Sequence, residues 1–208
     1  MDIVHPLVIE YLRHVQPVKD PIIDAMRRYS REQKSPTIGT LGGQLLAQLS
    51  LLIGAKAVFE LGSNFGYSTL WFARALPPDG NVHLTQPNIE RAVKAKEFLQ
   101  QAGVLDRIVF HTGDPLEALL AERGPFDIIM LNLGPKNLAA LPAIRDRLRA
   151  GGLLVTPSCF QQGRVIRQSD DTGVQNQQIF NHTISHDPAF VTTFHPIRDG
   201  IAVSWKKP

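Results

Sequence analysis

The chain has 208 residues, of which 43 % are hydrophobic and 20 % are charged, values that are ordinary for a globular protein with a buried core. The net charge is +3, and the basic residues are scattered along the chain. The densest basic cluster is Arg145, Arg147 and Arg149, and their spacing places them on different sides of a helix, so we expect no nucleic-acid partner. With one cysteine, no signal-peptide pattern and no apolar stretch of about 20 residues, the sequence predicts a soluble cytoplasmic protein without a disulfide framework or a membrane segment.

The N-terminal part predicts two helices. Asp20 followed by Pro21 is a typical helix start, and an apolar stripe at helical spacing continues to about Lys34. A loop over 35–39 leads to a second apolar helix that begins near Thr40 and ends before Gly54. We therefore interpret residues 1–35 as a helical extension of a single domain that spans 1–208.

From residue 57 onward, short apolar runs alternate with helical patterns. Strands are expected at 57–61, 82–85, 107–111, 126–131 and 153–156, and helices at 67–76, 88–102, 115–122 and 138–149, the last stopped by Gly151 and Gly152. Strands separated by helices predict a parallel sheet covered on both faces, because a parallel crossover needs a helix to carry the chain back.

The C-terminal part departs from this alternation. Two strand-like runs, 190–195 and 201–205, are joined by a short loop that contains Asp199 and Gly200, which is typical of an antiparallel hairpin. The predicted fold class is therefore α/β, with a doubly wound, mostly parallel seven-stranded sheet that ends in an antiparallel hairpin. A plain dinucleotide-binding domain would close with a sixth parallel strand.

The turn after the first predicted strand is the candidate cofactor site. Ligands of doubly wound sheets bind at the carboxyl ends of the strands, where the strand order reverses. Gly62 permits a tight turn there and Gly66 permits close helix packing. A dinucleotide site is the weaker interpretation, because Asn64 replaces the second glycine of its motif and Gln86 replaces the acid after the second strand.

Several motifs in order resemble one known family. The segments AKAVFELGSNFGYSTLWFARALP, ERAVKAKEFLQQAGVLDRIVFHTGDPLEALL, GPFDIIMLN and HPIRDGIAVSWKK are similar to the O-methyltransferases of the catechol and caffeoyl-CoA type, which use S-adenosylmethionine (SAM). The resemblance runs from about Pro36 to the C-terminus. It implies a Rossmann-like class I methyltransferase fold, SAM as cofactor and a small hydroxylated acceptor.

The resemblance also implies roles for individual residues around SAM. The residues at the positions that contact the methionine part of SAM are Thr37, Ile38, Glu60, Gly62, Asn64 and Ser68. Those at the ribose positions are Gln86 and Pro87, and those at the adenine positions are Gly113, Asp114 and Pro115. Asn132 and Leu133 are at the positions beside the reacting methyl group. Simpler interpretations stay open for two of them: Glu60 as a solvated charge at a strand end and Asp114 as a helix N-cap.

The chain departs from the family where a metal would bind. Members normally carry Asp-x-Asp after the fourth strand and Asp-Asn after the fifth, and these carboxylates hold Mg²⁺. Here Asn132, Gly134 and Pro157 stand at those positions, so we expect no metal, unless Asp170 or Asp171 rebuilds the site.

The same departure leaves the catalytic residues open. Asn132 and Lys136 are candidates, the latter one residue away from the position of a family lysine that assists deprotonation, and no histidine is placed at the site by its sequence position. The expected function is a metal-independent, SAM-dependent O-methyltransferase. The alternative is a catalytically degenerate protein that binds SAM or a related ligand. Family analogy implies a homodimer, with the helix over 21–34 as a possible partner surface.

Overall fold

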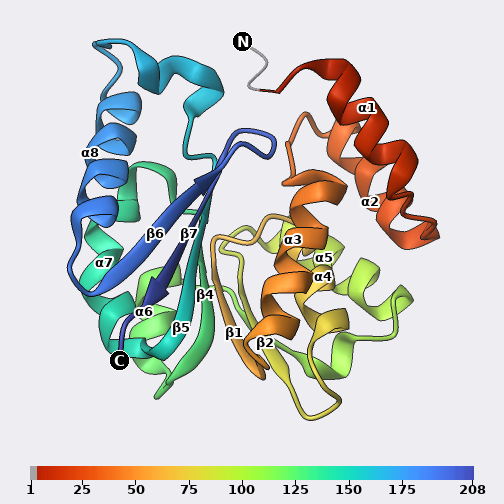
Figure 1. The fold of residues 1–208 in the computed structure, drawn as a ribbon. Coiled ribbons are helices and arrows are strands. Elements are labelled where there is room, and N and C mark those ends of the chain that lie inside the picture. Colours follow the sequence, from red (N-terminus) through yellow and green to blue (C-terminus); the bar gives the residue numbers. More distant parts are fainter. Residues whose placement is uncertain (1–3) are drawn as a thin grey trace.

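The computed structural model describes residues 4–208 as a sheet between two layers of helices (Figure 1). Its strands are β1 (Ala57–Leu61), β2 (Asn81–Thr85), β3 (Ile108–His111), β4 (Phe126–Leu131), β5 (Leu148–Pro157), β6 (Phe190–His195) and β7 (Ile201–Lys206). Their order in the sheet is β3-β2-β1-β4-β5-β7-β6. The first five pair in parallel, whereas β7 is antiparallel to both β5 and β6. The expected fold class is confirmed.

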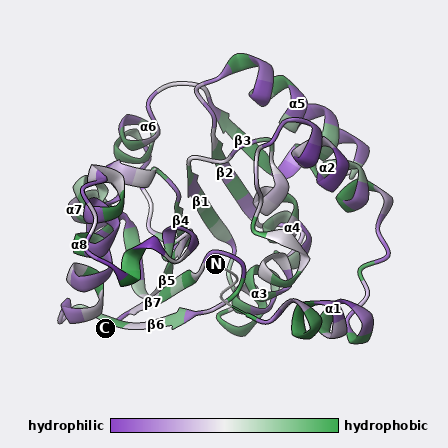
Figure 2. Ribbon diagram, turned by 90° about the horizontal axis from the view of Figure 1, so that it is seen from above, coloured by the Kyte–Doolittle hydropathy of each residue, from purple (hydrophilic) through white to green (hydrophobic). Residues whose placement is uncertain are grey.

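The helices of the described chain divide between the two faces of the sheet, as the view from above shows (Figure 2). They are α1 (Pro6–Val15), α2 (Pro21–Glu32), α3 (Gly39–Leu52), α4 (Tyr67–Ala75), α5 (Ile89–Gln101), α6 (Pro115–Ala121), α7 (Asn137–Arg147) and α8 (Thr172–His186). Short 3-10 turns lie at Leu105–Arg107, Gly134–Lys136 and Gln161–Ile166. No helix in residues 4–208 combines the length and the apolar character that a membrane span requires.

Two hydrophobic clusters follow from the alternation of side chains along the strands. Val58, Val82 and Ile128 face α2 to α5, whereas Phe59 and Ile129 face α6 to α8. Each central strand is therefore apolar on both faces, as a covered parallel sheet requires. The core sits directly under the strand ends that carry the candidate site.

The N-terminal helices differ in how they attach. In α2, Asp20 caps the first turn as predicted, and Ile23 and Met26 are buried in the core beside α5. The helix α1, which was not predicted, buries no residue. The apolar stripe of α2 thus packs inside the molecule, so only its exposed side, which carries Arg28 and Arg31, is accessible to a partner.

The boundary between α7 and β5 corrects the sequence interpretation. The helix ends at Arg147, and Gly151 and Gly152 lie inside β5 rather than stopping a helix. Arg149 belongs to β5 and pairs with Asp127, and Arg145 pairs with the buried Asp187. Arg149 therefore lies off the helix, whereas Arg145 is exposed on α7 as expected and also anchors this helix to Asp187.

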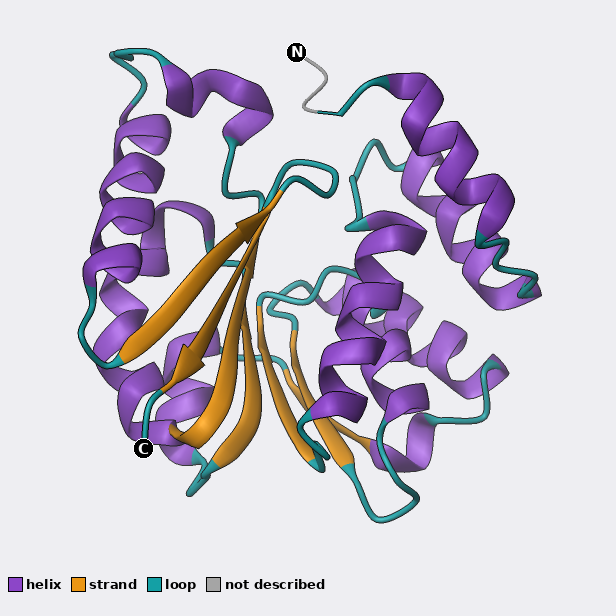
Figure 3. Ribbon diagram, viewed as in Figure 1, coloured by secondary structure: helices purple, strands orange, loops and turns teal. Residues whose placement is uncertain are grey.

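The hairpin places its loop at the functional edge of the sheet. In the β5–β7 pairing, Pro157 at the end of β5 lies opposite Ile201 at the start of β7. The β6–β7 loop therefore stands beside the carboxyl ends of the parallel strands, as Figure 3 shows.

Candidate active site

A cavity of about 630 Å³ opens at the carboxyl ends of β1, β4 and β5. This volume lies within the range of about 300–1,000 Å³ that is usual for small-molecule sites. Of the residues to which the resemblance gave a role, those that line the cavity are Thr37, Ile38, Gly62, Asn64, Ser68 and Asn132. Those outside its lining are Glu60, Gln86, Pro87, Gly113, Asp114, Pro115, Leu133 and Lys136.

The turn after β1 owes its shape to two glycines in left-handed conformations. Gly62 has φ of 87°, and a Cβ there would lie 2.4 Å from the backbone oxygen of Asn132. The glycine therefore lets the ends of β1 and β4 meet, whereas the sequence argument stressed the turn alone. Gly66 has φ of 81° and packs against Leu99 of α5. Both positions restrict the turn to residues without a side chain.

Glu60 is buried behind this turn and is not the solvated strand-end charge considered above. Only 1 % of its surface is exposed, and its carboxylate accepts hydrogen bonds from the hydroxyls of Ser68 and Thr69. Burial raises the pKa of Glu60 to about 7, against the opposing effect of the two hydroxyls. Because Ser68 lines the cavity, it connects this carboxylate with the space where a ligand would lie.

Asn64 offers an unused polar atom at the cavity. Its amide nitrogen donates to the Ser35 hydroxyl, whereas its Oδ1 is buried and has no hydrogen-bond partner among residues 4–208. A buried acceptor without a partner is costly unless a ligand supplies a donor. The ammonium group of SAM has the required donors, so the turn fits the methionine end of this cofactor.

The side-chain amide of Gln86 is held by backbone groups of its own loop and of the β1–α4 turn. Its nitrogen donates to the backbone oxygens of Ser63 and Asn64, and its oxygen accepts from the backbone N–H of Asn88 at 3.0 Å. Two carbonyl oxygens on one side can be satisfied only by a donor, which fixes the orientation of this amide. Gln86 is thus a brace beneath the β1–α4 turn.

The residues expected at the adenine lie outside the lining of the cavity. Asp114 caps α6 by accepting from the backbone N–H groups of Leu116 and Glu117, the simpler interpretation considered above. A Cβ at Gly113 would meet no atom within 4 Å, so the exit of β3 faces open space. Pro87 is exposed nearby, and Lys136 is exposed in the short turn before α7.

Another part of the cavity lining carried no signal in the sequence. Ile9 and Arg13 of α1 contribute to it, as do Gln162 and, from the β6–β7 loop, Arg198 and Asp199. Asp199 accepts a hydrogen bond from the backbone N–H of Gln162, and burial raises its pKa. The hairpin motif was recognised, but only the β5–β7 pairing brings its loop to this edge.

The seven-stranded order with a terminal antiparallel hairpin, together with a glycine turn and a cavity at the end of β1, defines a class I methyltransferase that binds SAM. A family model for O-methyltransferases matches residues 16–207. The chain belongs to this O-methyltransferase family, and it is a SAM-dependent enzyme.

Individual relatives agree with this assignment. A catechol O-methyltransferase of Mycobacterium tuberculosis is 32 % identical over 73 % of this chain and 71 % of its own length. A caffeoyl-CoA O-methyltransferase of Eucalyptus globulus is 30 % identical over 77 % and 71 %. Among solved structures, an O-methyltransferase of tomaymycin synthesis from Streptomyces achromogenes, in complex with SAM, has a TM-score of 0.87 at 25 % identity, covering 97 % of this chain and 96 % of that one.

Proposed function

We propose that this enzyme transfers the methyl group of SAM to a hydroxyl of a small acceptor without a divalent cation, with both substrates in the 630 Å³ cavity. The observation that carries the proposal is the chemistry of the strand ends. Asn132 and Gly134 follow β4 and Pro157 ends β5, where the family resemblance implies carboxylates. Mg²⁺ releases its water reluctantly and is usually held by one or two carboxylates.

The remaining polar groups at these ends support the same proposal. The Asn132 amide nitrogen donates to the backbone oxygen of Gly62 at 3.3 Å, which ties the two strand ends together. Asp171, which could have rebuilt a metal site, instead caps α8 and pairs with Arg164. Asp170 is exposed outside the cavity lining.

We extend the proposal to the general base, which we assign to Asp199. It is the only carboxylate among the described residues that line the cavity, and Lys136, the earlier candidate, does not line it. In the reaction the acceptor oxygen forms a bond to the methyl carbon as the carbon–sulfur bond breaks and its electron pair stays on sulfur. The hydroxyl proton passes to Asp199, whose raised pKa makes it a stronger base than an exposed aspartate.

The charges of the cavity favour a particular kind of acceptor. Arg13 and Arg198 line it together with Asp199, so the cavity lining holds two cationic side chains and one carboxylate. An acceptor that carries an acidic group beside its hydroxyl would pair with a guanidinium while its hydroxyl faces Asp199. Hydroxylated aromatic acids are therefore the first acceptors to assay.

The experiment is a methyl-transfer assay with SAM and a panel of phenols, catechols and hydroxylated aromatic acids, with and without EDTA. We expect turnover to survive EDTA and catechols to have no special advantage. Asp199→Asn should lower kcat by about 10²–10⁴-fold, the usual contribution of a general base. The exposed Asp106→Asn is the matched control. Activity that collapses in EDTA and returns with Mg²⁺ would contradict the proposal, and SAM binding without turnover would favour the degenerate alternative.

We also propose that the protein is a homodimer, on the strength of the family resemblance, and that it is cytoplasmic, on the strength of its single cysteine. In place of the buried stripe of α2, α1 carries exposed apolar side chains, among them Leu7, Tyr11 and Val15. Light scattering after gel filtration tests the dimer. A monomer at concentrations of about 100 μM would contradict it.

A further inference from the structure

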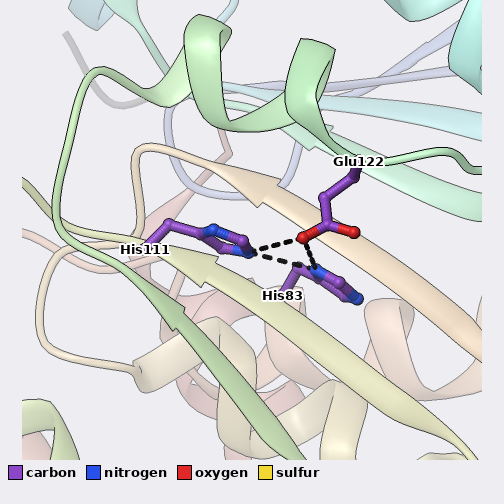
Figure 4. Close-up of side chains that lie close together, drawn as sticks. All are labelled: His83, His111 and Glu122. Atoms are coloured by element: carbon purple, nitrogen blue, oxygen red, sulfur yellow. Dashed lines mark hydrogen bonds and ion pairs between the residues drawn. The ribbon is translucent and has the colours of Figure 1, made fainter.

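Two histidines and a glutamate meet on the face of the sheet covered by α6, outside the cavity (Figure 4). His83 lies in β2, His111 ends β3, and Glu122 follows α6 directly. His83 Nδ1 lies 3.1 Å from His111 Nε2, and Glu122 Oε1 lies 3.8 and 3.9 Å from these two atoms. Three side chains from three elements thus bring one potential ligand atom each within 4.8 Å of the other two, and the two ring nitrogens are within hydrogen-bond distance of one another.

The fold creates this meeting from residues far apart in sequence. Residues that pair across neighbouring strands lie on the same face of a sheet, and every second residue of a strand lies on that face. His83 pairs with Val109, two residues before His111, and it also pairs with Phe59. His83, His111 and Phe59 therefore share one face. The two imidazoles stack at 5.3 Å between centroids, and both lie 5.5 Å from the Phe59 ring. This aromatic floor fixes the ring planes and excludes water from one side.

The separations fit a single metal ion. A circle through three points 3.1, 3.8 and 3.9 Å apart has a radius of about 2.1 Å, and zinc binds imidazole nitrogen at about 2.0–2.1 Å and carboxylate oxygen at about 2.0–2.2 Å. We propose that His83 Nδ1, His111 Nε2 and Glu122 Oε1 form a binding site for a transition-metal ion of the Zn²⁺ class.

The donor set itself selects the class of metal. A neutral imidazole offers the lone pair of one ring nitrogen to a metal ion. Two imidazoles and one carboxylate select a borderline ion such as Zn²⁺ over Mg²⁺. The Glu122 side chain is 35 % exposed, which gives the ion a path from solvent and leaves a fourth position for water.

The site is separate from methyl transfer. None of its residues lines the cavity, and β3 is the edge strand of the sheet. A metal there would tie the edge strand to β2 and to the end of α6. We therefore expect its effect to be on stability, and the metal-independence of catalysis does not depend on it.

The test uses the full chain, freed of metal and of any histidine tag, in a His182→Ala/His186→Ala background. That exposed pair stacks at 4.2 Å on α8 and could chelate metal by itself. Titration with Co²⁺, followed by its visible absorption and by displacement with Zn²⁺, should show one equivalent bound in four-coordinate geometry. Saturating Zn²⁺ should raise the unfolding temperature by about 5 °C.

Two variants separate the metal site from a simple hydrogen-bonded histidine pair. Glu122→Gln removes the carboxylate ligand but keeps the shape of the side chain. His83→Phe removes an imidazole ligand and places an aromatic ring beside Phe59 and Phe126, which surround His83. Each should weaken Zn²⁺ binding at least about tenfold and abolish the thermal shift. Glu117→Gln, on the exposed side of α6, should leave both unchanged. Absence of stoichiometric Co²⁺ binding, or equal affinity in the variants, would overturn the proposal.

Discussion

Replacing Glu60 by glutamine should make the free protein more stable at high pH and weaken its binding of SAM. The folded carboxyl has a pKa of about 7, against 4.5 for an ordinary glutamate. Below pH 4.5 the Glu60 carboxyl is protonated in both the folded and the unfolded state, so no charge is buried when the protein folds. As the pH rises from 4.5 to about 7, the unfolded state loses the proton first, so stability falls, and above 7 the full cost persists.

The difference of 2.5 pKa units corresponds to about 3 kcal/mol. Glutamine keeps the shape and stays neutral, so Glu60→Gln should gain about 2–3 kcal/mol relative to wild type between pH 5 and pH 8. Urea unfolding of both proteins across this range measures the gain. The exposed Glu32→Gln is the control and should follow wild type.

The same variant should bind SAM at least about tenfold more weakly at pH 8, because the Glu60 carboxylate carries a negative charge behind Ser68, which lines the cavity, and this charge favours the cofactor's ammonium, whereas an amide is neutral. Calorimetry with SAM measures this loss. Parallel pH profiles of stability for Glu60→Gln and wild type would refute the burial argument. Equal SAM affinity would refute the role of Glu60 in binding the methionine end.

Two further substitutions test the packing around the site. Gln86→Glu should lower stability at pH 8 by about 2–4 kcal/mol and leave SAM affinity unchanged or weaker, because a carboxylate would face the backbone oxygens of Ser63 and Asn64; tighter SAM binding would show that residue 86 faces the ribose. Gly43→Ala should cost about 1–3 kcal/mol despite its better helix propensity, because the added Cβ would lie 2.2 Å from the Trp71 ring; an unchanged melting temperature would show that the indole moves freely.

The sheet could be predicted because its signals are local. Four of the parallel strands, β1 to β4, have four to six residues between helical patterns, and the apolar run 153–156 indicates the longer β5. The Asp-Gly loop indicates the hairpin. The helix α8 was not predicted because few apolar residues mark its buried face: Val174, Phe180 and Ile184 are separated by polar residues. Its N-cap, Asp171, was a usable signal that was interpreted as a possible metal ligand.

The candidate site could be predicted only where residues lie close in sequence. The turn from Gly62 to Ser68 is one continuous segment, and its motif identified both the fold and the cofactor. The placement of Asp199 at the cavity and the meeting of His83, His111 and Glu122 depend on which strands become neighbours. No local sequence pattern indicates the order of the strands. Gln86 shows a third limit: its position was expected from the family, but the hydrogen bonds of its amide are a property of packing.

The position of β7 sets an order of events during translation. This last strand of the chain inserts between β5 and β6, so a nascent chain that ends before Ile201 has both of these strands but not the one that joins them. Until β7 emerges from the ribosome, the edge of β5 presents unpaired N–H and C=O groups, a surface prone to wrong pairing. The cofactor turn after β1 can form much earlier, whereas the wall that carries Asp199 closes only with the final strand. A chain released before β7 is complete would thus have the cofactor turn but would lack the part of the cavity lining that carries Asp199.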